Sequence, residues 1–216
     1  MIVARSRAAL LASLLVLQGC VAEDMAAVTT PPPPTAEATD PAFYAARADG
    51  NRMLSAIDVA AFHPALLRNR VPFETKEAPG TIVIDTKGPF LYLVEPDGMA
   101  LRYGISIGKE GFGWTGDGRI AREARWPTWT PPPEMIARDP SLARWKDGMP
   151  GGPSNPLGAR ALYIYFGDRD SGYRIHGTNA PGSIGRAASS GCFRMLNQDV
   201  VDLYDRVPRG ARVIVR

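Results

Sequence analysis

The residues of this sequence best suited to chemistry are one histidine and one cysteine, sixteen positions apart. His176 stands in the run Tyr-Arg-Ile-His-Gly-Thr, and Cys192 in the run Ser-Ser-Gly-Cys-Phe-Arg-Met. A thiolate is a strong nucleophile, and an imidazole can accept its proton and return it to a leaving amine near neutral pH. Either residue alone is more simply explained by packing in a core. Together, each next to a glycine, they predict acyl transfer through a cysteine.

Strand signals surround both residues and indicate a mainly β domain. We expect a meander of antiparallel strands in which His176 ends one strand and Gly177 lets another group approach closely. The β-branched and aromatic runs are Thr81–Asp85, Phe90–Val94, Ala100–Ile107, Ala161–Phe166, Tyr173–Ile175 and Arg212–Val215.

One helix is predicted after the cysteine, because apolar residues recur at helical spacing from Leu196 to Val207. Asn197 is the expected cap of this helix. Cys192 would then lie in a turn at the helix N-terminus, where free N–H groups and the helix dipole favour a thiolate and a developing oxyanion.

Regular periodicity is lost between Gly108 and Gly158, a span that holds all four tryptophans of the chain. Long irregular insertions in a domain are usually functional or disordered, and tryptophan argues against disorder. Two interpretations stay open and are compatible: a lid or wall of a substrate groove, and a loop held against the core by its aromatic rings.

The N-terminal segment has the features of an export signal. Arg5 and Arg7 precede an apolar run that is too short to span a bilayer. The run ends in Leu-Gln-Gly-Cys, which resembles the lipobox of bacterial lipoproteins. This resemblance implies acylation of Cys20 and a periplasmic protein anchored to the outer membrane. The alternative is a plain secretion signal and a soluble periplasmic protein.

Four segments are expected along the 216 residues. Residues 1–19 form a lipoprotein signal peptide, 20–40 a proline-rich tether, 41–78 a partly helical lead-in, and 79–216 the catalytic domain. Removing residues 1–19 leaves a net charge of +1, because that segment holds two of the 25 basic residues and none of the 22 acidic ones. Nucleic acid is therefore not an expected partner. With two cysteines and two histidines in the whole chain, we expect neither a metal site nor a cofactor.

Residues 79–216 resemble the L,D-transpeptidase catalytic domain, also called the YkuD domain. The family pattern is His-Gly-Thr followed, after about fifteen residues, by Ser-His-Gly-Cys, a branched apolar residue, Arg and an apolar residue. It matches His176-Gly177-Thr178 and Ser189 to Met195 here. Ser190 replaces the usual second histidine, and Phe193 a smaller branched residue. The resemblance implies a β-sandwich or meander with one helix after the catalytic cysteine and a long loop rich in Trp, Pro and Gly.

The resemblance also implies a peptidoglycan reaction. Cys192 would attack the bond between the diamino acid of a tetrapeptide stem and its terminal D-alanine, with His176 as acid and then base. The acyl group would pass to an amine of a second stem, giving a 3→3 crosslink, or of an envelope protein. Two alternatives are transfer to water, which makes an L,D-carboxypeptidase, and a lipoprotein that binds peptidoglycan without catalysis. Papain-like and caspase-like enzymes order or space their cysteine and histidine differently.

Further site residues follow from the same resemblance. The histidine Nδ1 would be oriented by a backbone carbonyl near Gly177. Backbone N–H groups around Gly191 and Cys192, next to Ser190, would hold the oxyanion. Because the diamino acid and D-alanine carry carboxylates, a guanidinium could bind the substrate. Arg194 is the first candidate, although it could equally shape the cysteine turn. The remaining substrate-binding candidates are Thr178 and Arg174.

Overall fold

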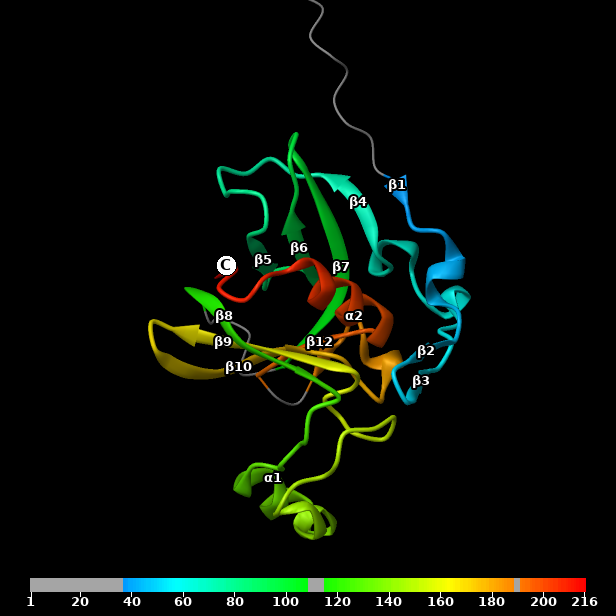
Figure 1. The fold of residues 1–216 in the computed structure, drawn as a ribbon, viewed down its shortest axis with the longest axis vertical. Helices are drawn as coiled ribbons and strands as arrows, with labels where there is room; N and C mark the ends of the chain where they lie inside the picture. The colour runs from blue at the N-terminus through cyan, green and yellow to red at the C-terminus, as the bar shows by residue number, and fades with distance from the viewer. Residues whose placement is uncertain (1–36, 109–114, 189–190) are drawn as a thin grey trace, which may run out of the picture. The chain divides into compact units, whose positions relative to one another are not determined.

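The computed structural model describes residues 37–108, 115–188 and 191–216. Its strands are β1 (Glu37–Ala38), β2 (Arg47–Asp49), β3 (Arg52–Leu54), β4 (Asn69–Pro72), β5 (Ile82–Asp85), β6 (Phe90–Val94), β7 (Met99–Gly108), β8 (Gly116–Arg125), β9 (Arg160–Phe166), β10 (Arg169–His176), β11 (Ala187–Ala188), β12 (Phe193–Met195) and β13 (Arg212–Val215). The α-helices are α1 (Pro133–Arg138) and α2 (Asn197–Arg206). The prediction of a mainly β domain is confirmed (Figure 1).

The main sheet closes on itself. Neighbouring strands follow the order β7, β12, β10, β9, β8, β13, β5 and β6, and β6 pairs again with β7. Strands β5, β6 and β7 form the predicted antiparallel meander. The expected strands β9 and β10 also pair antiparallel. The expectation of a purely antiparallel meander is wrong at two places, because β10 runs parallel to β12 and β13 runs parallel to β5. Both parallel partners are reached after long crossover connections rather than hairpins.

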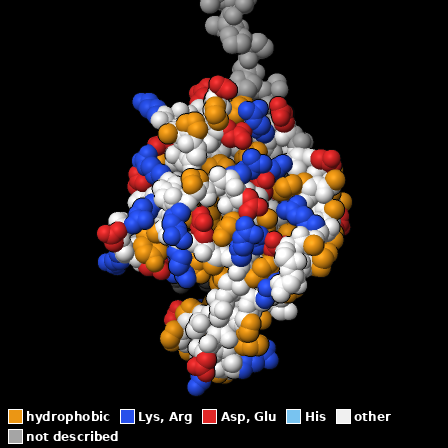
Figure 2. Space-filling model, viewed as in Figure 1, with side chains coloured by type: hydrophobic (Ala, Val, Ile, Leu, Met, Phe, Trp, Pro, Cys, Tyr) orange, Lys and Arg blue, Asp and Glu red, His pale blue; other side chains and the backbone are white. Residues whose placement is uncertain are grey.

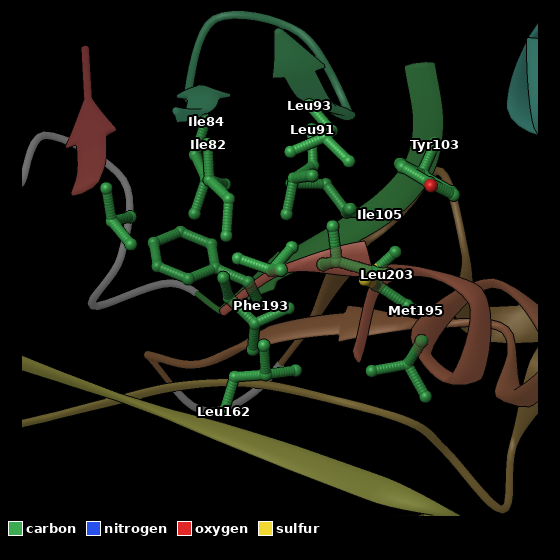
Figure 3. Close-up of a cluster of buried hydrophobic side chains, with 14 of the residues drawn as sticks. Ile82, Ile84, Leu91, Leu93, Tyr103, Ile105, Leu162, Phe193, Met195 and Leu203 are labelled. Carbon is green, nitrogen blue, oxygen red and sulfur yellow. The ribbon is translucent and has the colours of Figure 1, made fainter. Parts of the chain in front are cut away.

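The core fills the space between the strands and α2. Figure 3 shows Phe193 and Met195 of β12 among side chains from β5, β6 and β9, with Leu203 of α2 nearby. All three of these side chains are fully buried. Alternate residues of a strand point to opposite faces. Arg194, which lies between Phe193 and Met195 in β12, therefore faces away from the core.

Helix α2 begins where the sequence predicts, but its cap differs. Asn197 is the first helical residue, and Leu196 holds the N-cap position without a side-chain hydrogen bond. The prediction of Asn197 as the cap is therefore wrong. The physical reason is that the side-chain amide of Asn197 forms hydrogen bonds with two neighbouring loops and is not available to cap the helix.

The segment expected to be a partly helical lead-in contains short 3-10 helices (Pro41–Tyr44, Val59–Ala61 and Pro64–Leu66) and strands β2 to β4, and no α-helix is found in residues 41–78. Two buried polar contacts attach it to the catalytic domain. Arg160 of β9 donates to both carboxylate oxygens of Asp49 at 2.7 Å. The hydroxyl of Tyr44 donates to Asp199 of α2 at 2.9 Å.

Charged side chains of both signs are mixed on one face of the molecule. Figure 2 shows Lys and Arg interspersed with Asp and Glu on the face that it presents, rather than one continuous basic area. In the described part of the chain, none of the helices is both long enough and apolar enough to cross a membrane.

Candidate active site

The parallel pairing of β10 with β12 brings the two candidate catalytic residues together. Ile175 lies opposite Phe193, and His176 lies opposite Arg194. Cys192 immediately precedes β12. Adjacent strands are about 4.8 Å apart and a residue rises about 3.3 Å, so a two-residue offset puts the Cα atoms of Cys192 and His176 about 8 Å apart.

Strand alternation decides which way these side chains point. Ile175, Phe193 and Met195 are fully buried in the core, as Figure 3 shows for the last two. The residues that alternate with them, His176 and Cys192, therefore lie on the outer face of the sheet, on neighbouring strands. Adjacent thiol and imidazole groups on one face are the arrangement that proton transfer between them requires.

Cys192 is a half-buried thiol at the start of β12. Its sulfur lies 4.0 Å from the carbonyl oxygen of Gly172 in β10. The expectation that it lies at a helix N-terminus is wrong, because the strand Phe193–Met195 separates it from the first residue of α2. A helix dipole acts within about one turn of the helix end, so it does not activate this thiol. Arg194 is a cation near this thiol. Burial lowers the pKa of Arg194, and its attraction to Cys192 partly offsets that decrease.

His176 is buried, with 4% of its surface exposed. Its Nδ1 lies 2.6 Å from the carbonyl oxygen of Gly177, the contact that the sequence predicts. Burial lowers the pKa of His176 to about 4; the Gly177 carbonyl opposes this decrease, and the charges of Arg194 and Arg174 add to it. The imidazole is thus neutral at pH 7, with Nδ1–H donated to Gly177 and Nε2 left as the basic nitrogen.

Asn197 is the site residue that the sequence analysis missed in this role. Its Oδ1 accepts hydrogen bonds from the N–H groups of Ala159 (3.0 Å) and Thr178 (3.2 Å), and its Nδ2 donates to the Thr178 carbonyl at 2.8 Å. A Cβ on Gly177 would lie 2.2 Å from the same Oδ1. The glycine therefore lets the amide approach, which explains why the histidine is followed by glycine.

The three substrate-binding candidates have different surroundings. Arg194 lies opposite His176 on the outer face. Arg174 forms a two-pronged ion pair with Asp170, at 2.7 and 2.9 Å. Thr178 is buried, and its hydroxyl accepts a hydrogen bond from the N–H of Ala180. Its side chain therefore shapes the loop after His176.

Of the other predicted site residues, Gly191 is among those that the structure describes. Gly191 is half-buried beside Cys192, and its assignment to the oxyanion site stays a prediction. Ser190 and Cys20 lie outside the described residues. Within residues 37–108, 115–188 and 191–216, no group of three or more His, Cys, Asp or Glu side chains is placed to hold a metal ion.

The tryptophan-rich insertion is attached through Trp126. The indole Nε1 donates to Asp49 at 2.8 Å, and the ring packs against a buried cluster of Leu54, Ala159 and Val201. This fits the interpretation of a loop held to the core by aromatic rings. Farther along, α1 projects from the sheet at the bottom of Figure 1. Trp114 lies outside the described residues, and the lid interpretation stays a prediction.

The comparisons with known proteins identify the family. The model of the L,D-transpeptidase catalytic domain, YkuD, matches residues 79–215. The chain belongs to the L,D-transpeptidase family. The members of this family act on the peptide stems of peptidoglycan, and the outer face that carries Cys192 and His176 lies inside the matched region.

Relatives agree with this assignment. The probable L,D-transpeptidase ErfK/SrfK of Escherichia coli K12 is 38% identical over 141 residues, which cover 61% of this chain and 42% of that protein. A putative L,D-transpeptidase YkuD of Bacillus licheniformis is 36% identical, covering 63% of this chain and 66% of that protein. This chain thus spans less than half the length of the first of these relatives.

A solved structure is also similar. A Brucella melitensis protein described as a probable carnitine operon oxidoreductase is 51% identical, with a TM-score of 0.50, and the match covers 70% of this chain and 94% of that one. The activity in that description belongs to the Brucella protein. Residues 79–215 of the present chain match the L,D-transpeptidase domain.

Proposed function

We propose that this L,D-transpeptidase family member is a cysteine-dependent acyltransferase of the bacterial cell wall. Its donor is the tetrapeptide stem of peptidoglycan, and it cleaves the bond between the diamino acid and the terminal D-alanine. The observation that carries the proposal is the register of β10 against β12, because it sets Cys192 and His176 on one sheet face in adjacent strands.

In the first half-reaction the thiol proton of Cys192 moves to Nε2 of His176, and the sulfur attacks the carbonyl carbon of the diamino acid. Burial keeps the His176 imidazole neutral at pH 7, so Nε2 is able to accept the proton; the same lowered pKa makes the imidazolium a strong acid that readily gives the proton up again. The C–N bond then breaks. The proton on Nε2 passes to the departing D-alanine nitrogen, and the acyl group remains on the sulfur as a thioester.

In the second half-reaction an amine attacks the thioester. His176 takes the proton of the amine, the new C–N bond forms as the C–S bond breaks, and the proton passes from Nε2 to the sulfur to regenerate the thiol of Cys192. The contact between Nδ1 and the Gly177 carbonyl keeps Nε2 directed at the reaction through both steps. The amine comes from a second stem, which produces a 3→3 crosslink, or from an envelope protein.

We also propose that the protein works in the periplasm, held to the outer membrane through a lipidated Cys20. The support is the sequence Leu17 to Cys20 after a short apolar run. Mass spectrometry of the mature N-terminus tests this: an acylated Cys20 is expected, and an unmodified N-terminus elsewhere would indicate a soluble periplasmic protein.

The activity is tested by incubating purified tetrapeptide muropeptides with wild type and Cys192→Ala. Wild type should release D-alanine and produce dimers of the mass expected for a 3→3 link, and Cys192→Ala should produce neither. Tripeptides without dimers would replace the proposal with an L,D-carboxypeptidase. Binding without any change in the substrate would replace it with a peptidoglycan-binding module. A candidate envelope protein added to the same reaction tests the other acceptor.

A further inference from the structure

Four strands contribute to a row of outer-face residues that ends at the catalytic thiol. Arg122 of β8 lies opposite Tyr163 of β9, and Tyr163 lies opposite Arg174 of β10. Because Ile175 and Phe193 are partners in the parallel pair, the preceding residues, Arg174 and Cys192, are neighbours across the same pair. The register therefore connects Arg122 to Cys192 through two intervening side chains.

The tyrosine ring of this row is held between two guanidinium groups. The Arg122 guanidinium carbon lies 3.5 Å from the centre of the Tyr163 ring, and that of Arg174 lies 4.5 Å from it. Tyr163 is 6% exposed as a result. Asp170 binds both terminal nitrogens of Arg174 and so fixes its orientation. We call Arg122, Tyr163 and Arg174 the arginine–tyrosine ledge.

The ledge carries two positive charges against one carboxylate. Asp170 forms an ion pair with Arg174 and also attracts the charge of Arg122 from farther away. Arg122 is exposed, and within the described residues no carboxylate forms an ion pair with it. Stacking on the ring holds the Arg122 guanidinium flat and leaves its N–H edge accessible. A planar cation of this kind binds a carboxylate through two parallel hydrogen bonds.

The position of His176 indicates which part of the substrate meets the ledge. His176 lies two residues beyond Arg174 along β10, opposite Arg194. Both the departing D-alanine and the incoming amine exchange a proton with His176, so they occupy that side of the thiol. The row through Arg174, Tyr163 and Arg122 is left for the part of the stem that remains attached to the sulfur.

We infer that the arginine–tyrosine ledge is a carboxylate-binding subsite for the acyl-donor stem, with Arg122 as the residue that contacts the carboxylate. This inference rests on the proposed function. It assigns donor selection to β8 and β9, outside the histidine and cysteine motifs.

The test compares D-alanine release by wild type, Arg122→Gln and Arg119→Gln. Arg119 is the matched control, because it also lies on β8 and is already paired with the exposed Asp168 at 3.0 Å. We expect Arg122→Gln to raise KM for the tetrapeptide stem about tenfold or more, since charged hydrogen bonds contribute at that level, with kcat within about twofold. Arg119→Gln should leave both values unchanged.

Amidated stems identify the carboxylate. Stems are prepared with a carboxamide in place of either the diamino-acid carboxylate or the glutamate α-carboxylate. One of them should raise the wild-type KM by the same factor as Arg122→Gln, and Arg122→Gln should show no further loss with it. An unchanged KM for Arg122→Gln, a penalty that persists with both amidated stems, or a lower melting temperature with unchanged KM would each overturn the inference.

The inference and the proposed function can fail separately. If wild type releases no D-alanine from any stem, the proposed function fails. Calorimetric binding of the stems to Cys192→Ala and to Cys192→Ala/Arg122→Gln then decides the inference by itself. Weaker binding by the double variant of the unmodified stem and of one amidated stem, with equal binding of the other amidated stem, supports the subsite, and equal binding of all stems by both proteins overturns it.

Discussion

The side-chain amide of Asn197 is hydrogen-bonded to both backbone polar groups of Thr178. Its Oδ1 accepts from the Thr178 N–H, and its Nδ2 donates to the Thr178 carbonyl. Thr178 follows Gly177, whose own carbonyl contacts Nδ1 of His176. The first turn of α2 therefore fixes the loop that orients the imidazole, and we expect Asn197 to act as a positioning residue.

Asn197→Asp should separate positioning from binding. The aspartate keeps an acceptor for the N–H groups of Ala159 and Thr178, but it places a second carboxylate oxygen against the Thr178 carbonyl where a donor stood. We expect kcat for D-alanine release to fall by about 10- to 100-fold, because small displacements of a catalytic group have effects of this size. KM should change less than twofold.

The matched control for this variant is Asn179→Ala, which removes an exposed amide bonded to the Ser154 carbonyl. It should retain wild-type kcat. NMR titration of His176 in Asn197→Asp adds a second readout, since a displaced loop should change its lowered pKa. If kcat stays at the wild-type value, the positioning role is refuted.

Gly177→Ala should disturb the same contact from the other side. The added Cβ would lie 2.2 Å from Oδ1 of Asn197 and 3.1 Å from the Ala159 nitrogen, so the loop or α2 must move. We expect a decrease in kcat comparable to that of Asn197→Asp and a lower melting temperature. Gly182→Ala is the control, because nothing lies within 4 Å of its Cβ position. Equal activity of the two glycine variants would contradict the prediction.

Two buried groups, His176 and Asp199, should make the free energy of unfolding change with pH in opposite directions. Burial lowers the pKa of His176 to about 4, so between that pH and 6.5 the unfolded chain binds more protons and stability rises with pH. This contribution amounts to about 3 kcal/mol. Burial raises the pKa of Asp199 to about 8, so the folded chain holds the extra proton and stability falls from pH 4 to 8.

Urea unfolding across pH 4 to 8 measures both contributions. Asp199→Asn should remove the decrease and expose a clear rise in the free energy of unfolding up to pH 6.5. His176→Asn should remove that rise and leave a continuous decrease. The carboxyls of Asp49, Asp117, Asp170 and Asp202 have lowered pKa values, so they add their own rise in stability up to about pH 5, and the two variants are compared between pH 5 and 8. Parallel curves for the two variants would disprove the assignment.

Asp49→Ala should strongly destabilise the protein. Asp49 is the carboxylate that binds Arg160, whose side chain is 1% exposed, and it also accepts from the indole of Trp126. Removing it leaves a buried guanidinium unpaired, which typically costs about 3 to 5 kcal/mol. Urea unfolding at pH 7 checks this, with Asp168→Ala as an exposed ion-pair control for which no measurable change is expected. A cost below about 1 kcal/mol would contradict the buried-pair argument.

Local patterns were sufficient for much of the fold. The strands β5, β6 and β7 follow one another through short turns, and each carries β-branched or aromatic residues, so their antiparallel pairing is legible in sequence. The helical spacing in α2 is equally local. The His-Gly-Thr and Gly-Cys motifs also predict the candidate pair, His176 and Cys192, because glycine beside a nucleophile or a base indicates a close approach of the backbone.

Long-range relationships were not predictable in this way. Nothing local to Cys192 indicates that β12 runs parallel to β10, yet that pairing determines its neighbours. The contact between Asn197 and Thr178 joins residues that are 19 positions apart. Asn197 was assigned as a helix cap because caps are the commonest local role of asparagine. In the folded protein the Asn197 side chain instead forms hydrogen bonds with residues that are distant in the sequence.

The placement of β13 has a consequence for the order in which the sheet forms during folding. Residues 212–215 are inserted between β5 and β8, more than a hundred positions after the first of these strands. Until these residues pair, β5 and β8 each keep one strand edge without its hydrogen-bonding partner. We therefore expect the sheet that carries Cys192 and His176 to close only after β13 has paired with both of its neighbours.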